Sequence, residues 1–154
     1  MTLELSANDA QALYLGHLWG LISREQIVKT AENIIERSIE VPSAKICELA
    51  LSVSKQQIET RLKKFITGAD KWEAVRFLIR KYIKLGELNE VQLITLYYSI
   101  GNYADWDDEN PWREIKILTH ELSDAKRGIY GDEKLIAKEI REKILTQLLS
   151  LIHI

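Results

Sequence analysis

The sequence has few of the residues that interrupt helices. Its 154 residues include 7 glycines and 2 prolines, about half the share of an average soluble domain. Because β-sandwiches and β-barrels need turn residues at short intervals, this scarcity argues against both. Hydrophobic residues make up 46% of the chain and charged residues 29%, a balance that argues against disorder. The composition therefore predicts an all-α protein, folded as a single domain over residues 1–154.

Disulfides and long apolar segments are also lacking. Cys47 is the only cysteine, which excludes an intrachain disulfide and fits a reducing compartment. It lies in a helical pattern and is expected to be a small buried residue. The first five residues do not resemble a secretory signal, and the longest apolar stretch, 144–154, is too short to span a membrane. We therefore expect a cytoplasmic protein that does not bind a membrane.

Helix N-cap signals recur along the chain and predict about eight helices. A Ser, Asp or Asn before an apolar periodic segment is typical of an N-cap, and a Gln or Glu three positions later completes a capping box. Such boxes begin at Ser23, Ser54 and Asp70. Further helix starts are predicted at Ser6, Ser43, Asn89, Pro111 (as the first helical residue) and Asp132.

The predicted helix ends depend mainly on glycine. Helices are expected to stop at Gly20, Gly68, Gly86 and near Gly101. Residues 123–131 are expected to form a connector. The last helix carries an apolar stripe at Ile136, Ile140, Ile144, Leu148 and Leu151. Because that helix is apolar on both sides, it is either central in the core or covered by a second chain, and a monomer is favoured over a homodimer.

A weak internal repeat relates two parts of the chain. Residues 20–28 resemble 86–94, and residues 42–49 resemble 111–118. Two similar four-helix halves, 1–68 and 69–154, stacked as a short solenoid-like bundle, would explain both matches. Repeated use of the same helix-stop and N-cap residues explains them as well.

The three histidines offer little chemistry. His17 is expected to be a buried or half-buried, hydrogen-bonded imidazole. His120 and Glu121 begin the zinc-binding His-Glu-x-x-His pattern, but Asp124 replaces the second histidine, which leaves two ligands at most. His153 lies in the C-terminal tail. No nucleophile elbow, phosphate loop or dinucleotide fingerprint occurs, so no enzymatic activity, metal or cofactor is predicted.

The most unusual segment is 102–112, which holds four acids, two Trp and one Tyr. A calcium loop is disfavoured, because Asn110 and Lys116 stand where an EF-hand needs Gly and Glu. One interpretation is a solvated acidic loop with Trp112 in the core. The other is a partner-binding loop whose acids steer a basic partner and whose aromatic side chains anchor it. The predicted partner-binding residues are Tyr103, Asp105, Trp106, Asp107, Asp108, Glu109 and Trp112.

A basic stretch precedes this acidic region. Residues 61–84 contain eight Lys and Arg against two Asp and Glu, whereas residues 85–114 contain one against seven. The spacing of Arg76, Arg80 and Lys84 predicts a stripe on one helix face. It is either a solvated face or a nucleic-acid contact, although the pI of about 6.0 argues against strong phosphate binding. The basic residues are Arg61, Lys63, Lys64, Lys71, Arg76, Arg80, Lys81 and Lys84.

Two segments, the helix junction at Trp19–Ser23 and the loop Tyr103–Trp112, give the chain the general character of a known class of proteins. With them, the chain resembles the small helical immunity proteins of bacterial contact-dependent growth inhibition and related polymorphic-toxin systems. The resemblance implies a cytoplasmic protein that binds a cognate toxin with a basic surface, often a nuclease, and occludes its active site. The basic stretch departs from a purely acidic surface. The alternative function is a helical adaptor or regulator that binds nucleic acid through residues 61–84.

Overall fold

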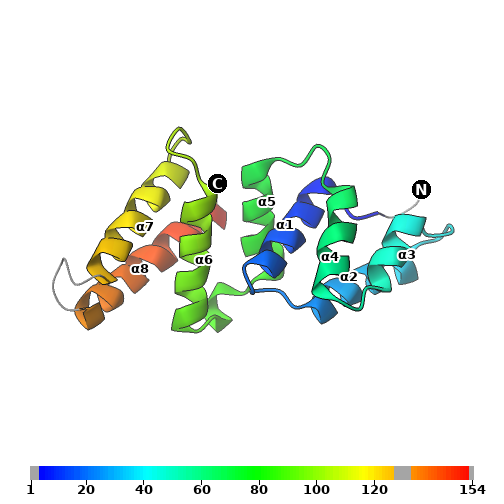
Figure 1. Cartoon of the computed structure of the whole chain (residues 1–154), viewed down its shortest axis with the longest axis horizontal. Coiled ribbons are helices and arrows are strands. Elements are labelled where there is room, and N and C mark those ends of the chain that lie inside the picture. Colours follow the sequence, from blue (N-terminus) through cyan, green and yellow to red (C-terminus); the bar gives the residue numbers. More distant parts are fainter. Residues whose placement is uncertain (1–3, 127–132, 153–154) are drawn as a thin grey trace. The chain divides into compact units, whose positions relative to one another are not determined.

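The computed structural model describes residues 4–126 and 133–152, and the side chains of residues 4–121 and 142–151. The described part contains eight α-helices and no strand, which confirms the all-α prediction (Figure 1). The helices are α1 (Ala7–Leu18), α2 (Arg24–Arg37), α3 (Ala44–Ala50), α4 (Lys55–Leu62), α5 (Lys71–Phe77), α6 (Glu90–Tyr103), α7 (Trp112–Lys126) and α8 (Glu133–Ile152). None of the described helices is both long and apolar enough to cross a membrane.

The chain divides into two compact units, an N-terminal unit of residues 1–83 and a C-terminal unit of residues 84–154. The halves predicted from the internal repeat would meet at 68/69 instead, and that repeat stays a prediction. The border lies further along the chain because α5 packs against α1 and so belongs to the N-terminal unit. The folding of both units as a single domain stays a prediction.

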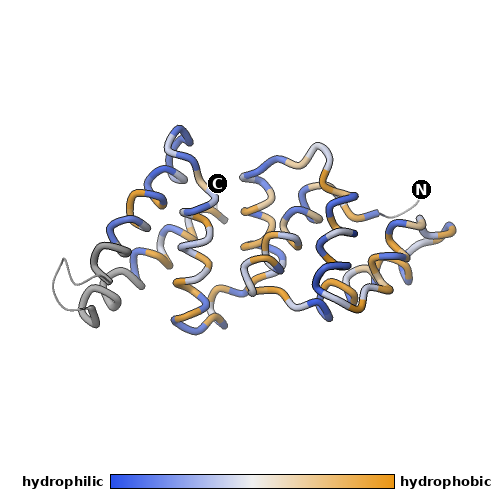
Figure 2. Tube along the Cα trace, in the orientation of Figure 1, coloured by the Kyte–Doolittle hydropathy of each residue, from blue (hydrophilic) through white to orange (hydrophobic). Residues whose placement is uncertain are grey.

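Helix α1 is the packing centre of the N-terminal unit, where it contacts α4 and α5, while α2 packs on α3. Its Ala10, Ala12, Leu13 and Leu15 are buried, and Figure 2 shows hydrophobic residues recurring along it. Gly16 has a packing role, since a Cβ there would clash with the side chains of Ile22 and Leu78. The small residues of α1 therefore allow its neighbours to approach closely.

The predicted N-caps form at six helix starts. Each of these side chains accepts a hydrogen bond from a first-turn N–H: Ser6, Ser23, Ser43, Ser54, Asp70 and Asn89. The reciprocal capping box is complete at Ser23 and at Asn89. At Ser54 it is not, because Gln57 Oε1 accepts from the N–H of Val53 instead, at 2.9 Å.

The glycines end helices at two of the four predicted positions. Gly20 and Gly68 have φ of 75° and 86°, as expected of a glycine that follows a helix. Helix α6 ends at Tyr103, near Gly101 as predicted, but Gly101 itself lies inside the helix, where a Cβ would clash with Thr119 of α7. Its lack of a side chain therefore lets α6 and α7 approach closely.

The predicted long helix from Asp70 to Gly86 is interrupted. Helix α5 ends at Phe77 and continues as a π-helical turn, η2 (Leu78–Tyr82), after which Ile83 is extended with φ −118° and ψ 127°. A π turn takes more residues per turn than an α-helix, and Lys84 follows the last turn. The expected stripe of Arg76, Arg80 and Lys84 on one helix face is therefore not formed.

In the C-terminal unit, α6 packs on both α7 and α8. The stripe of the last helix is buried at Ile144, Leu148 and Leu151, whereas Leu149 is exposed. Helix α7 begins at Trp112, directly after Pro111, and runs to Lys126, so it covers part of the predicted connector. Several other predictions lie outside the described backbone or side chains: Asp124, Asp132, Ile136, Ile140 and His153.

Candidate protein-interaction site

The acidic–aromatic loop, defined as Tyr103–Trp112, joins α6 to α7 through a turn closed by its own residues. The N–H of Asp105 donates to Asp108 Oδ2 at 2.6 Å, and the N–H of Asp108 donates to the carbonyl oxygen of Asp105 at 3.0 Å. Short side chains that bond the nearby backbone in this way stabilise turns. The N–H of Arg113 then donates to the carbonyl oxygen of Glu109 at 3.2 Å. The loop therefore has a defined local conformation.

The four acids of this loop are not equivalent. Asp105, Asp107 and Glu109 are exposed, but Asp108 is only half exposed. One carboxylate oxygen of Asp108 accepts the hydrogen bond that closes the turn. Asp108 therefore has a structural role, and the other three carboxylates form the outward-facing negative charge.

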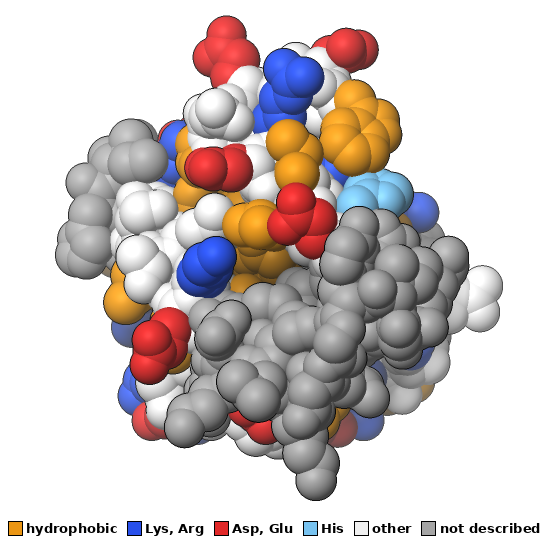
Figure 3. Space-filling view, turned by 90° about the vertical axis from the view of Figure 1, so that its left-hand side faces the viewer, with side chains coloured by type: hydrophobic (Ala, Val, Ile, Leu, Met, Phe, Trp, Pro, Cys, Tyr) orange, Lys and Arg blue, Asp and Glu red, His pale blue; other side chains and the backbone are white. Residues whose placement is uncertain are grey.

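Trp106 is the aromatic residue that the loop presents to solvent. It is 52% exposed, yet its ring lies 5.0 Å from the ring of His120 on α7, at an interplanar angle of 32°. Lys116 Nζ lies 5.2 Å from the same ring centroid and donates to the carbonyl oxygen of Gly101 at 3.2 Å. Figure 3 shows a histidine (pale blue) beside a hydrophobic side chain on this face. Contacts with α7 thus hold Trp106 at the surface.

The other two aromatic residues of the predicted site are placed differently. Trp112 is 4% exposed and belongs to the core, which agrees with the interpretation that tucks it beneath the loop. With so little of its ring exposed, Trp112 offers less surface to a partner than Trp106 does, and its predicted anchoring role stays a prediction. Tyr103 is half-buried at the end of α6.

Sequence reasoning missed the contribution of α7 to this surface. The sequence pattern around His120 suggests only a metal ligand, and Lys116 enters only as a mismatch to a calcium loop. Both contact Trp106, and Ile117 beside them is also exposed. The spacing of 116, 117 and 120 does predict one helix side, but nothing local indicates that Trp106 folds back onto it.

The basic stretch is largely engaged within the N-terminal unit. Lys81 Nζ lies 3.2 Å from Asp9 Oδ1 and 4.3 Å from the ring centroid of Phe77. Lys63 Nζ lies 5.4 Å from the ring centroid of Tyr14. These two cations therefore contact carboxylate and aromatic groups of their own unit.

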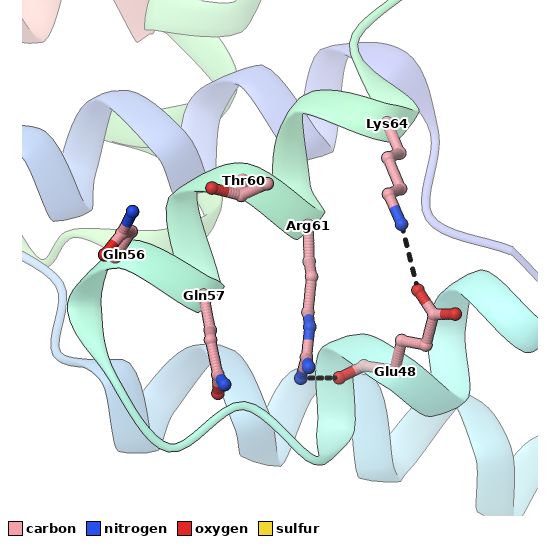
Figure 4. Close-up of a pocket in the computed structure, with 6 residues that line it drawn as sticks. All are labelled: Glu48, Gln56, Gln57, Thr60, Arg61 and Lys64. Carbon is pink, nitrogen blue, oxygen red and sulfur yellow. Dashed lines mark hydrogen bonds and ion pairs between the residues drawn. The ribbon is translucent and has the colours of Figure 1, made fainter.

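Two more members of the basic stretch line a hollow of about 460 Å³ between α3 and α4 (Figure 4). Arg61 donates to the carbonyl oxygen of Glu48 at 2.6 Å, where α3 ends, and Lys64 pairs with the carboxylate of Glu48 at 3.0 Å. These polar groups hold two helices together and satisfy a helix C-terminus. The hollow is lined by Glu48, Gln56, Gln57, Thr60, Arg61 and Lys64.

Asp9 is the centre of an electrostatic cluster in the N-terminal unit. Its carboxylate accepts hydrogen bonds from Ser6 at 2.6 Å and from the Tyr82 hydroxyl at 2.8 Å, beside Lys81. Burial alone would raise the pKa of Asp9, but the hydrogen bonds from Ser6, Tyr82 and Lys81 lower it below its usual value of 3.8. Burial and the bond to Asp9 raise the pKa of Tyr82. The cluster ties the start of α1 to η2.

His17 and Cys47, the two remaining residues considered for chemical roles, both lie partly buried within the N-terminal unit. His17 Nδ1 lies 3.3 Å from Glu59 Oε1, with a side chain 9% exposed, which confirms the predicted hydrogen-bonded imidazole. Cys47 is half-buried rather than buried. No group of three or more His, Cys, Asp or Glu within the described residues is placed to hold a metal ion.

Comparison with models of protein families, with curated proteins and with solved structures finds nothing that matches this chain. Its functional assignment therefore depends on the chemistry of its own surface.

Proposed function

We propose that this chain is a protein-binding module that docks a basic partner on the acidic–aromatic loop and the adjoining side of α7. The observation that carries this proposal is Trp106, a large ring that is more than half exposed while His120 and Lys116 hold it. A ring held in this way gives up little conformational freedom when a partner covers it. Rigid, amphipathic side chains of this kind are enriched among the residues that dominate binding energy.

The exposed carboxylates beside Trp106 define the charge of the partner. Asp105, Asp107 and Glu109 project from the same short loop, and Asp108 fixes its turn. A cluster of negative charge speeds the association of a positively charged partner and makes the binding of a negatively charged protein unfavourable. The partner surface therefore carries Lys or Arg around an apolar recess that takes the indole ring.

The particular partner that we propose is a bacterial toxin, with this chain as its cytoplasmic immunity protein. The support is the resemblance to immunity proteins of contact-dependent growth inhibition, together with the charge of the loop. A nuclease toxin contacts phosphates through basic residues. Carboxylates that pair with those residues would occlude the active site and exclude nucleic acid.

Co-purification with the product of the neighbouring upstream gene tests the proposal, followed by titration calorimetry of the complex. Trp106→Ala is expected to weaken binding by about 2 kcal/mol or more, as for a central anchor. The triple variant D105N/D107N/E109Q is expected to weaken it less and to reduce its salt dependence. If the partner is a nuclease, the variants that bind it more weakly should also inhibit its activity less.

Matched variants elsewhere provide the controls. Leu51→Ala removes an exposed apolar side chain of the N-terminal unit, and E25Q/E32Q/E36Q removes three exposed carboxylates of α2. Both controls should bind like the wild type. Equal effects of the loop variants and their controls on affinity would contradict the proposed site.

The nucleic-acid alternative has less support. The stripe of Arg76, Arg80 and Lys84 on which it rests does not form on one helix face. Lys81 and Lys64 pair with carboxylates of the same unit. Salt-sensitive binding of RNA or DNA that is lost in R76Q/R80Q would revive this function.

A further inference from the structure

A groove between α7 and α8 lies outside the acidic–aromatic loop. It has a volume of about 480 Å³. Glu114 comes from α7 and Glu142 from α8, so each helix contributes a carboxylate, and half-buried Leu118 adds a hydrophobic surface. Figure 3 shows a hollow on this face, with hydrophobic side chains between acidic and basic ones. The groove is lined by Glu114, Leu118, Glu142, Lys143, Thr146 and Gln147.

A residue of α6 holds Gln147, one of the side chains that line the groove. Tyr97 of α6 is buried, and its hydroxyl donates to Gln147 Oε1 at 2.6 Å. Burial, and then the negative charges of Glu114 and Glu121, raise the pKa of Tyr97. The hydroxyl therefore remains a donor at all ordinary pH values, and Gln147 is held in one orientation.

The groove adjoins a side of α7 that combines acidic and apolar residues. Glu114, Ile117, Leu118 and Glu121 follow the spacing of a single helix side. Ile117 and Glu121 are exposed. Among the described side chains, the charges along this side and in the groove are Glu114, Glu121 and Glu142 against Lys143. A surface of this composition is complementary to a segment that is both apolar and basic.

We infer that the α7–α8 groove binds a cationic amphipathic helix of the partner. The apolar side of that helix covers Leu118 and Ile117, and its Lys or Arg side chains reach Glu114 and Glu142. A helix is favoured over an extended peptide, because a groove between two helices offers side chains and no unpaired strand edge to pair with. The inference rests on the proposed function only in assigning this helix to the same partner as the loop.

The test uses the full-length chain and a synthetic peptide probe, measured by fluorescence anisotropy. The probe is a labelled helix of about 18 residues, with Leu along one side and Lys along the other. We expect it to bind more tightly than its scrambled version, and the version with Glu in place of Lys to bind least. E114Q/E142Q should weaken binding about five- to tenfold, as expected for two partly exposed ion pairs. The control E25Q/E32Q removes two exposed carboxylates of α2 and should change nothing.

Leu118→Lys provides a second variant, which adds a repelling charge and should reduce binding further, with circular dichroism as the check of folding. Equal binding of the probe and its scrambled version, or equal effects of E114Q/E142Q and the control, would overturn the inference.

Two results separate this inference from the proposed function. The purified partner should displace the probe, and failure to do so would overturn the assignment of the helix to that partner. The loop variant D105N/D107N/E109Q should leave probe binding unchanged while it weakens partner binding. Probe binding at the groove with unimpaired partner binding by that variant would instead contradict the loop as docking site.

Discussion

The basic stretch and the acidic–aromatic loop are both charge clusters in the sequence, but their side chains do different things. In the basic stretch, Arg61 forms a hydrogen bond and Lys64 and Lys81 form ion pairs with groups of the N-terminal unit. In the loop, Asp108 accepts the hydrogen bond that closes the turn, while Asp105 and Glu109 remain exposed around Trp106. A run of charge in a sequence therefore does not identify a binding surface; what matters is whether the folded chain already uses that charge.

The largest expected effect separates the two tryptophans of the loop. Trp112→Ala removes a buried ring and should lower the free energy of unfolding by about 3–5 kcal/mol. Trp106→Ala removes a half-exposed ring and should lower it by about 1 kcal/mol or less. Urea denaturation of both variants measures the difference. Similar losses would mean that Trp106 is a structural residue, which would remove the contrast between loop and basic stretch.

A middle-sized effect is expected where the basic stretch meets Asp9. Asp9→Asn weakens the bonds from Ser6, Tyr82 and Lys81 and should cost about 1–3 kcal/mol at neutral pH. Because the pKa of Asp9 is lowered in the folded state, its contribution is present above the unfolded pKa of 3.8 and is lost as pH falls through the folded pKa.

Denaturation curves recorded from about pH 6 downward check the sign of this effect. The gap in stability between wild type and Asp9→Asn should narrow as the pH falls below the unfolded value. Tyr82→Phe keeps the carboxylate of Asp9 but removes one of its hydrogen bonds. Its difference in stability from the wild type should be smaller and should also narrow as the pH falls. A gap that stays constant over this pH range would contradict a lowered pKa.

The smallest expected effect compares two arginines of the basic stretch. Arg61→Gln removes the donors to the carbonyl of Glu48 and to Ser52 and should cost about 1 kcal/mol. Arg80→Gln alters an exposed side chain and should change stability by less than about 0.5 kcal/mol. Thermal denaturation of the two variants is sufficient. If Arg80 mattered more than Arg61, the stretch would not stabilise the fold in the way its contacts indicate.

Local signals in the sequence determine much of this fold. Helix starts such as Ser23 and Asn89 follow from side-chain capping, which involves residues three positions apart. The π turn after Phe77 and the helical position of Gly101 could not be predicted, because tertiary packing sets both: Gly101 lets Thr119 approach, and η2 is tied to Asp9. Packing therefore overrode the local rule that glycine ends a helix.

The candidate site, like the fold, could be predicted only where local sequence determines it. The composition of residues 103–112 indicated an unusual loop, and the burial of Trp112 was one of the two interpretations. The stack of Trp106 on His120 joins residues from a loop and from the third turn of a helix, and no sequence period encodes that contact. The signal that was available, an exposed side of α7, becomes meaningful only when the loop folds against it.

Hydrogen–deuterium exchange of the chain with and without its co-purified partner tests the central claim most directly. The account predicts that the partner slows exchange in peptides covering residues 104–121 and leaves residues 61–84 unchanged, because the basic stretch is used within its own unit. Slower exchange confined to residues 61–84, with the loop and α7 unaffected, would contradict the account.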